Sequence, residues 1–179
     1  PENFWNSYPH QLSGGMRQRA MIAMAIVMDP DLIIADEPTT AIDAELQVQI
    51  VSELKRKINE KNNAMIFISH DLGVMRVLAD DIAIMYCGCL VEKGTAKSVL
   101  SQPKHPYTQA LVNALPRLVK NRIMPVAIPK NMPSPDAKPK GCVFCDRCPN
   151  VSDKCLDERP KLKEIDKNNT DTLEQLKAM

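Results

Sequence analysis

The sequence predicts an α/β fold, with part of a parallel sheet covered by helices, followed by a small irregular extension rich in cysteine. Residues 32–35 form an apolar run without alternating polar positions, which is typical of a strand buried on both faces of a parallel sheet. The segments on either side place apolar residues at helical spacing, and alternating strands and helices indicate a layered α/β fold. Four of the six cysteines lie between residues 142 and 155.

The first elements follow from local signals. A helix is expected over residues 14–28, with Ser13 as its N-cap, and it should end at Asp29 because a following proline disfavours helical backbone. Residues 32–35 are the first strand, residues 44–60 a second amphipathic helix, and residues 64–69 a second buried strand. His70 then lies at the carboxyl end of that strand, the edge at which open α/β sheets bind ligands.

The later elements are shorter. We expect a short helix over 71–79, a hairpin of strands 82–86 and 89–92 around Gly88, and helices over 95–100 and 103–115. The composition then becomes rich in proline, so the domains are expected to be 1–103 and 104–179. The polar tail from residue 161 to residue 179 is expected to be mobile or a frayed helix.

Composition excludes some functions. A net charge of +1 gives no indication of a groove for nucleic acid, so no nucleic-acid partner is expected. The longest apolar run, residues 20–28, is too short to span a bilayer, and no signal peptide is visible. The chain does not begin with methionine, so we expect it to be a fragment.

Two motifs indicate phosphate chemistry. Ser13, Gly14 and Gly15 open a helix, whose N-terminal N–H groups and partial positive charge suit a phosphate. Asp36 and Glu37 are adjacent carboxylates at the end of a strand, where they suit a hydrated magnesium ion and a general base.

Together these motifs resemble the ATP-binding cassette (ABC) family. Leu12-Ser13-Gly14-Gly15-Met16 resembles its signature motif, Asp36-Glu37 its Walker B end, Ala41-Ile42-Asp43 its D-loop, and Ser69-His70-Asp71 its switch histidine. The resemblance implies the C-terminal part of an ABC nucleotide-binding domain, with an incomplete parallel sheet of the P-loop NTPase type.

The resemblance also implies roles for these residues. Asp36 would hold Mg²⁺ through water, Glu37 would polarise the water that attacks the γ-phosphate, and His70 would contact that phosphate or water. The D-loop residue is Asp43. The signature would contact ATP bound to the facing subunit, through Leu12, Ser13, Gly14, Gly15, Met16 and Gln18.

A P-loop, Gly-x-x-x-x-Gly-Lys-Ser/Thr, is missing from the sequence. The nearest string, residues 94–98, has Ala96 where the second glycine is needed. This chain alone is therefore expected not to bind ATP tightly or hydrolyse it.

The cysteines indicate a second site. Cys142, Cys145, Cys148 and Cys155 have the spacing Cys-x2-Cys-x2-Cys-x6-Cys, which suits an iron–sulfur centre or structural zinc, and a disulfide or no metal remains open. With His105-Pro106-Tyr107-Thr108, this segment resembles the C-terminal extension of oligopeptide/dipeptide transporter ATPases, which implies a [4Fe–4S] cluster. A later cysteine usual in that extension is missing, so the ligand set is open.

The resemblance implies the ATPase subunit of an ABC importer of oligopeptides or dipeptides, using ATP and Mg²⁺. It would lie at the cytoplasmic face of the cell membrane, with a second ATPase subunit, two transmembrane permease subunits and, indirectly, an extracytoplasmic solute-binding protein. One alternative is a non-enzymatic truncated module that supplies a signature half-site and a metal-cluster docking surface. Another is an importer of nickel or another small solute.

Overall fold

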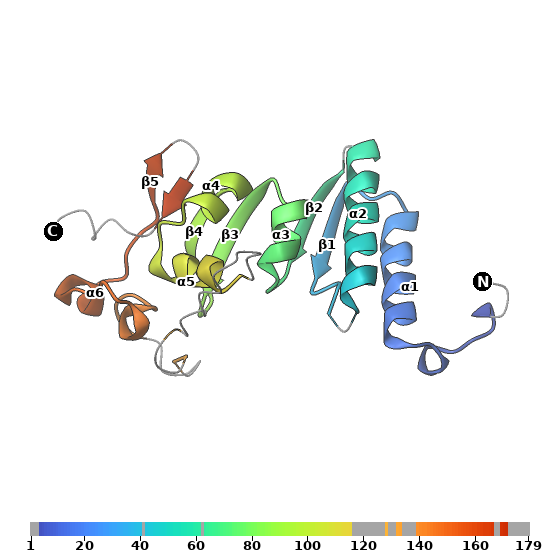
Figure 1. Cartoon of the computed structure of the whole chain (residues 1–179), viewed down its shortest axis with the longest axis horizontal. Coiled ribbons are helices and arrows are strands. Elements are labelled where there is room, and N and C mark those ends of the chain that lie inside the picture. The colour runs from blue at the N-terminus through green and yellow to red at the C-terminus, as the bar shows by residue number, and fades with distance from the viewer. Residues whose placement is uncertain are drawn as a thin grey trace, which may run out of the picture. The chain divides into compact units, whose positions relative to one another are not determined.

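The computed structural model describes residues 4–40, 42–61, 63–115, 128, 132–133, 139–166 and 169–171. The chain divides into two compact units, Pro1–Leu78 and Ala79–Met179. Figure 1 shows the elements of each unit. Within the described ranges, no helix combines the length and apolarity that crossing a membrane requires.

Among its described residues, the first unit contains a two-stranded parallel sheet and three α-helices. Its elements are η2 (Pro9–Gln11), α1 (Gly14–Val27), β1 (Leu32–Asp36), α2 (Ala44–Lys61), β2 (Ala64–Ile68) and α3 (Leu72–Leu78). The pairing places Leu32 opposite Ala64 and Asp36 opposite Ile68. Helices α1 and α2 lie side by side (Figure 1). These elements confirm the helices and strands predicted for residues 14–79, to within two residues at each end.

One face of this sheet is covered and the other is exposed. Residues Val51, Val74 and Leu78 of α2 and α3 form a buried cluster against Met65 and Phe67 of β2. Alternate strand residues point the other way, and they are about half exposed or more: Leu32, Ile34, Ile66 and Ile68. The prediction that both strands are buried on both faces is therefore wrong for this chain. An apolar strand sequence indicates that burial of its side chains is favourable. It does not determine whether another helix or strand covers both faces of the sheet.

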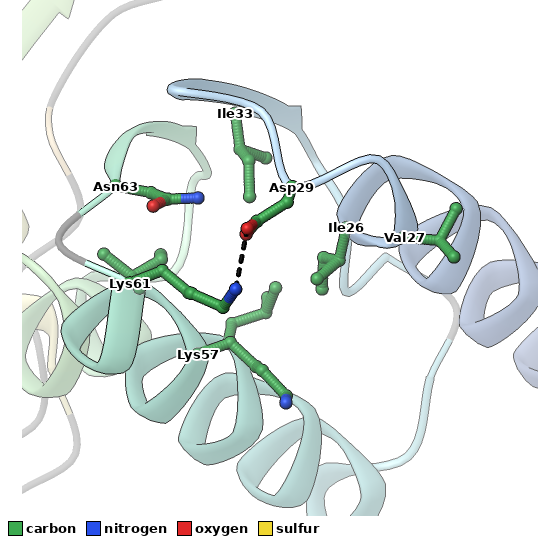
Figure 2. A pocket seen from close by; sticks show the side chains of 9 residues that line it. Ile26, Val27, Asp29, Ile33, Lys57, Lys61 and Asn63 are labelled. Atoms are coloured by element: carbon green, nitrogen blue, oxygen red, sulfur yellow. Dashed lines mark hydrogen bonds and ion pairs between the residues drawn. The ribbon is translucent and has the colours of Figure 1, made fainter.

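A hollow of about 430 Å³ lies between the ends of α1 and α2 (Figure 2). Its apolar lining includes Ile26 and Ile33, and a 2.7 Å ion pair joins Asp29 to Lys61 at its rim. Asn63 donates a 2.7 Å hydrogen bond to the carbonyl oxygen of Pro30. These polar contacts connect the end of α1 to the end of α2.

The second unit is built on a four-stranded antiparallel sheet with strand order β3-β4-β6-β5. Its elements are β3 (Asp81–Tyr86), β4 (Cys89–Thr95), α4 (Ala96–Ser101), α5 (Pro106–Ala114), η3 (Cys145–Arg147), α6 (Asp153–Asp157), β5 (Lys163–Asp166) and β6 (Asn169–Asp171). Cys87 and Gly88 join β3 to β4 with φ angles of 46° and 73°. Positive φ at both residues is the requirement of a type I′ hairpin turn.

The tail differs from its prediction. Residues 163–166 and 169–171 form strands, with Glu92, Lys93 and Gly94 of β4 paired to β6. The expected frayed helix or mobile segment is wrong for these residues, because backbone pairing with the edge of β4 outweighs the polar composition of the tail. Residues 172–179 lie outside the described ranges.

Glu92 organises the packing of α5 against the sheet. Its side chain is fully buried, and its two carboxylate oxygens accept hydrogen bonds from the backbone N–H groups of Lys104 and His105, at 2.9 and 3.0 Å. His105 caps α5 by accepting a hydrogen bond from Tyr107 N, and burial lowers the pKa of His105 to about 4. The neutral His105 ring therefore remains in the core at physiological pH.

We expect Glu92→Gln to lower the free energy of unfolding by about 2 kcal/mol, because the new amide N–H group would face a buried N–H donor. Urea denaturation followed by circular dichroism measures this change. The matched control is Lys93→Gln at the exposed neighbouring position, which should change stability by less than about 0.5 kcal/mol. Equal stability of the two variants would contradict this role of Glu92.

Candidate functional site

Asp36, Glu37 and His70 lie at one edge of the first sheet. Strands β1 and β2 are parallel and adjacent, so their carboxyl ends meet at the same edge. The backbone N–H of Glu37 donates a 2.9 Å hydrogen bond to Ile68 O, which extends the pairing beyond β1. Glu37 has a φ of 46°, a left-handed conformation that is uncommon outside glycine. The predicted grouping of these three residues is present in the structure.

The Glu37 carboxylate contacts two side chains. Its Oε1 lies 2.8 Å from His70 Nδ1, and its Oε2 accepts a 2.8 Å hydrogen bond from Thr40 Oγ1. The hydrogen bond from His70, followed by that from Thr40, lowers the pKa of Glu37. The same hydrogen bond to Glu37 and the attraction of its charge raise the pKa of His70. Both groups remain accessible, with side-chain exposures of 38% for Glu37 and 80% for His70.

Asp36 lies at the last position of β1 and is exposed. Among the residues that the structure describes, no three His, Cys, Asp or Glu side chains are arranged as a metal site. Mg²⁺ bound with a nucleotide needs only one or two carboxylates, since water and phosphates supply its other ligands. The exposed carboxylate of Asp36 fits that requirement.

The signature residues begin α1. Ser13 Oγ accepts a 3.3 Å hydrogen bond from Met16 N, which confirms Ser13 as the N-cap. A methyl group placed at Gly14 would meet nothing within 4 Å, whereas one at Gly15 would meet Leu46 of α2 at 3.5 Å. The start of α1 is therefore open to an approaching group on the side of Gly14.

Gln18 lies against the loop that follows β1. Its Nε2 donates hydrogen bonds to the carbonyl oxygens of Glu37, at 3.3 Å, and of Pro38. The sequence-based assignment placed Gln18 with the nucleotide contacts, and it contained no signal for this contact with Glu37. Sequence reasoning also missed Thr40, because a threonine after a strand end is common and carries no pattern.

Asp43 of the D-loop motif caps α2. Its Oδ1 accepts a 2.9 Å hydrogen bond from Leu46 N, and its carbonyl oxygen accepts one from Gln47 N at 2.9 Å. Ala41 of the same motif lies outside the described ranges.

The four C-terminal cysteines share one closed loop. Cys142 N donates a 2.8 Å hydrogen bond to Cys155 O, and a Cβ atom at Gly141 would lie 2.1 Å from that same oxygen. Glycine is therefore required where the loop closes. Cys145 N donates to Cys142 O, and Cys148 N donates to Cys145 O.

Within the described ranges, the four thiol groups are not arranged as a metal site. Cys145 Sγ lies 3.9 Å from Asp146 Oδ1, and Cys155 Sγ lies 3.3 Å from Ser152 Oγ. Burial raises the pKa of Cys142, Cys145 and Cys148. All six cysteines lie in described ranges and none forms a disulfide. The loop brings the predicted cysteines together, but the arrangement of its thiols gives the iron–sulfur and zinc predictions no support.

Aromatic contacts hold this loop to β3. The Phe144 and Tyr86 rings meet edge to face, with centroids 5.1 Å apart. Arg147 Nη1 donates a 3.1 Å hydrogen bond to Tyr86 OH, and its guanidinium lies 5.9 Å from the centre of that ring. Phe144 and Arg147 therefore pack the loop against Tyr86 of β3.

Comparison with protein-family models identifies two regions. Residues 1–40 match the ABC transporter model, and residues 91–155 match the model for the oligopeptide/dipeptide transporter C-terminal region. The first match contains the signature, Asp36 and Glu37, and the second ends at Cys155.

Curated relatives are similar along most of the chain. The chain is 44% identical to the oligopeptide transport ATP-binding protein AppD of Bacillus subtilis, covering 90% of this chain and 49% of that protein. It is 44% identical to the dipeptide transport ATP-binding protein DppD of Escherichia coli (90% and 50%) and 48% identical to the oligopeptide transport ATP-binding protein OppD of Salmonella typhimurium (86% and 46%). The chain spans about half the length of these relatives. It therefore belongs to the family of oligopeptide and dipeptide transport ATP-binding proteins of ABC transporters.

Proposed function

We propose that this chain is part of the ATP-hydrolysing subunit of an ABC importer that powers the uptake of oligopeptides or dipeptides. The observation that carries the proposal is the 2.8 Å contact between Glu37 and His70, beside Asp36, at the carboxyl edge of β1 and β2. The named relatives support the same activity, since each is a transport ATP-binding protein for oligopeptides or dipeptides. Those names favour a peptide over nickel as the solute.

Glu37 has the properties of the group that activates water. Its lowered pKa keeps the carboxylate ionised at neutral pH, so that it can accept a hydrogen bond from a water molecule next to the γ-phosphate. His70 fixes one oxygen of that carboxylate through Nδ1. The raised pKa of His70 favours the protonated ring, in which the other nitrogen, Nε2, also carries a proton and can donate to a phosphate oxygen as negative charge develops.

Asp36 is the proposed carboxylate for Mg²⁺, which neutralises charge on the phosphates when it is bound. The open start of α1, at Ser13 and Gly14, is the proposed contact to ATP held by a facing ATPase subunit. ATP would then favour closure of the two subunits, because this contact exists only while the triphosphate is present.

The remaining assignments complete this proposal. The protein would work at the cytoplasmic face of the membrane with a second ATPase subunit, two permease subunits and, indirectly, a solute-binding protein. The extension would begin near residue 104. Because the 179-residue sequence contains no P-loop, this chain by itself is expected to lack ATPase activity.

A separate proposal concerns the four cysteines. We infer that they bind a [4Fe–4S] cluster, with zinc as the alternative, on the basis of their spacing in the sequence and not of the positions of their thiols. Thiolate is the binding form, so metal binding would displace the protons that burial favours on these thiols. The metal would be structural.

In the intact transporter, Glu37→Gln should lower kcat for ATP hydrolysis by about 100-fold or more, because an amide cannot accept the proton of the attacking water. ATP affinity should persist. Steady-state ATP hydrolysis measures the ATPase activity. Uptake of a labelled dipeptide, a labelled oligopeptide and Ni²⁺ measures which solute is transported. The control Glu45→Gln, in the exposed first turn of α2, should retain both activities. Full activity of Glu37→Gln would exclude this role.

The pKa of His70 should lie above 6.5 and fall toward that value in Glu37→Gln. The two charges attract between the lowered pKa of Glu37, below 4.5, and the raised pKa of His70. The attraction is lost as pH rises through the His70 pKa or falls through the Glu37 pKa. NMR titration of the imidazole measures the shift. Glu53→Gln, which removes a partner of Arg56 instead, should leave it unchanged.

Protein purified without oxygen should contain about four iron and four labile sulfide atoms per chain if the cluster proposal holds. Cys142→Ser should lose them, whereas the double variant Cys87→Ser, Cys89→Ser should retain them. Stoichiometric zinc would favour the alternative, and folded protein without metal would exclude both.

A further inference from the structure

We propose that Gln18 is a positioning residue. It holds the backbone of Glu37 and Pro38 in the conformation that presents the Glu37 carboxylate for hydrolysis. The proposal rests on the proposed role of Glu37 in hydrolysis. Gln18 projects from the second turn of α1, and its Nε2 donates to the carbonyl oxygens of both Glu37 and Pro38. These bonds connect the signature helix directly to the turn that presents the Glu37 carboxylate.

The backbone at Glu37 needs such support. A non-glycine residue with φ of 46° persists only where surrounding contacts outweigh the local strain. Ile68 holds the N–H side of Glu37, while His70 and Thr40 hold its carboxylate. On the carbonyl side, the backbone N–H of Thr40 donates a 3.2 Å hydrogen bond to Glu37 O, and Gln18 adds bonds to Glu37 O and to Pro38 O.

Glutamine suits this position chemically. One amide nitrogen carries two N–H donors, which match the two successive carbonyl oxygens. Pro38 and Thr39 are buried, so water has limited access to the carbonyl groups of this turn. Without Gln18 the Glu37 carbonyl would keep its bond from Thr40 N, whereas the Pro38 carbonyl would lose the Gln18 donor. A buried carbonyl that loses its donor is destabilised, and the backbone at Pro38 would rotate to recover a hydrogen bond. Methionine has nearly the same length but no donor, and it would remove the restraint without a large change in volume.

The geometry also separates positioning from nucleotide contact. Gln18 lies one turn beyond Gly14, at the open start of α1, and its amide points to the Glu37 turn of its own chain. Loss of its hydrogen bonds should therefore lower kcat and leave KM for ATP unchanged. A residue that contacts ATP of the facing subunit would raise KM instead.

The first test uses hydrogen exchange on the 179-residue chain. In Gln18→Met, the amides of Glu37 and Thr40 should exchange about tenfold faster, as expected from the loss of one hydrogen bond, while amides in β2 and α2 stay unchanged. Gln49→Met makes the same chemical change at an exposed position of α2 and is the matched control. Unchanged exchange at residues 37–40 would overturn the proposal, as would faster exchange throughout the first unit, which would indicate a general loss of stability.

The second test measures ATP hydrolysis by the intact transporter. Gln18→Met should reduce kcat about tenfold with KM unchanged, and Gln49→Met should match the wild type. A raised KM with normal kcat would overturn the proposal in favour of a nucleotide contact. If the wild type does not hydrolyse ATP, the proposed function fails, and the exchange experiment still decides whether Gln18 positions the Glu37 turn.

Discussion

The parallel pairing of β1 with β2 is the constraint on which the candidate site depends. Because Asp36 lies opposite Ile68, the chain leaves both strands at the same edge, and Glu37 reaches His70 over 2.8 Å. A slip of one residue would turn the side chains of a strand to the opposite face and separate this pair. Gln18 and Thr40 can contact Glu37 next to His70 only when β1 and β2 pair in this register.

The second unit contains a short extension that is held in place by a few specific contacts. Its extension is short and rich in proline, so it cannot bury a large core of its own. The packing of Phe144 and Arg147 on Tyr86, and the closure of the cysteine loop at Gly141, provide a small ordered centre. Glu92 provides another, because both of its oxygens are used by backbone donors at the start of α5. Aromatic and polar contacts between segments far apart in the sequence thus supplement the apolar burial of this unit.

Local chemistry allowed much of this structure to be predicted. Ser13 caps α1 as expected, and α1 ends at Val27, before Asp29-Pro30. The grouping of Asp36, Glu37 and His70 was also predictable, because parallel neighbouring strands place their carboxyl ends together. The signal was weaker for the tail, where a polar sequence gave no indication of pairing with β4. It was also insufficient for the cysteines, since spacing fixes neither the rotamers nor the distances between thiols.

The sequence by itself determined where the helices and strands of residues 14–79 begin and end, which residues could carry phosphate chemistry, and which family the motifs resemble. These properties depend on residues close together in the chain, through capping, periodicity and turn chemistry. Only the tertiary structure decided which sheet face is covered, that the tail pairs with β4, and that Gln18 contacts the turn at Glu37. The reason is physical: these contacts join residues far apart in sequence, and their geometry depends on how whole elements pack.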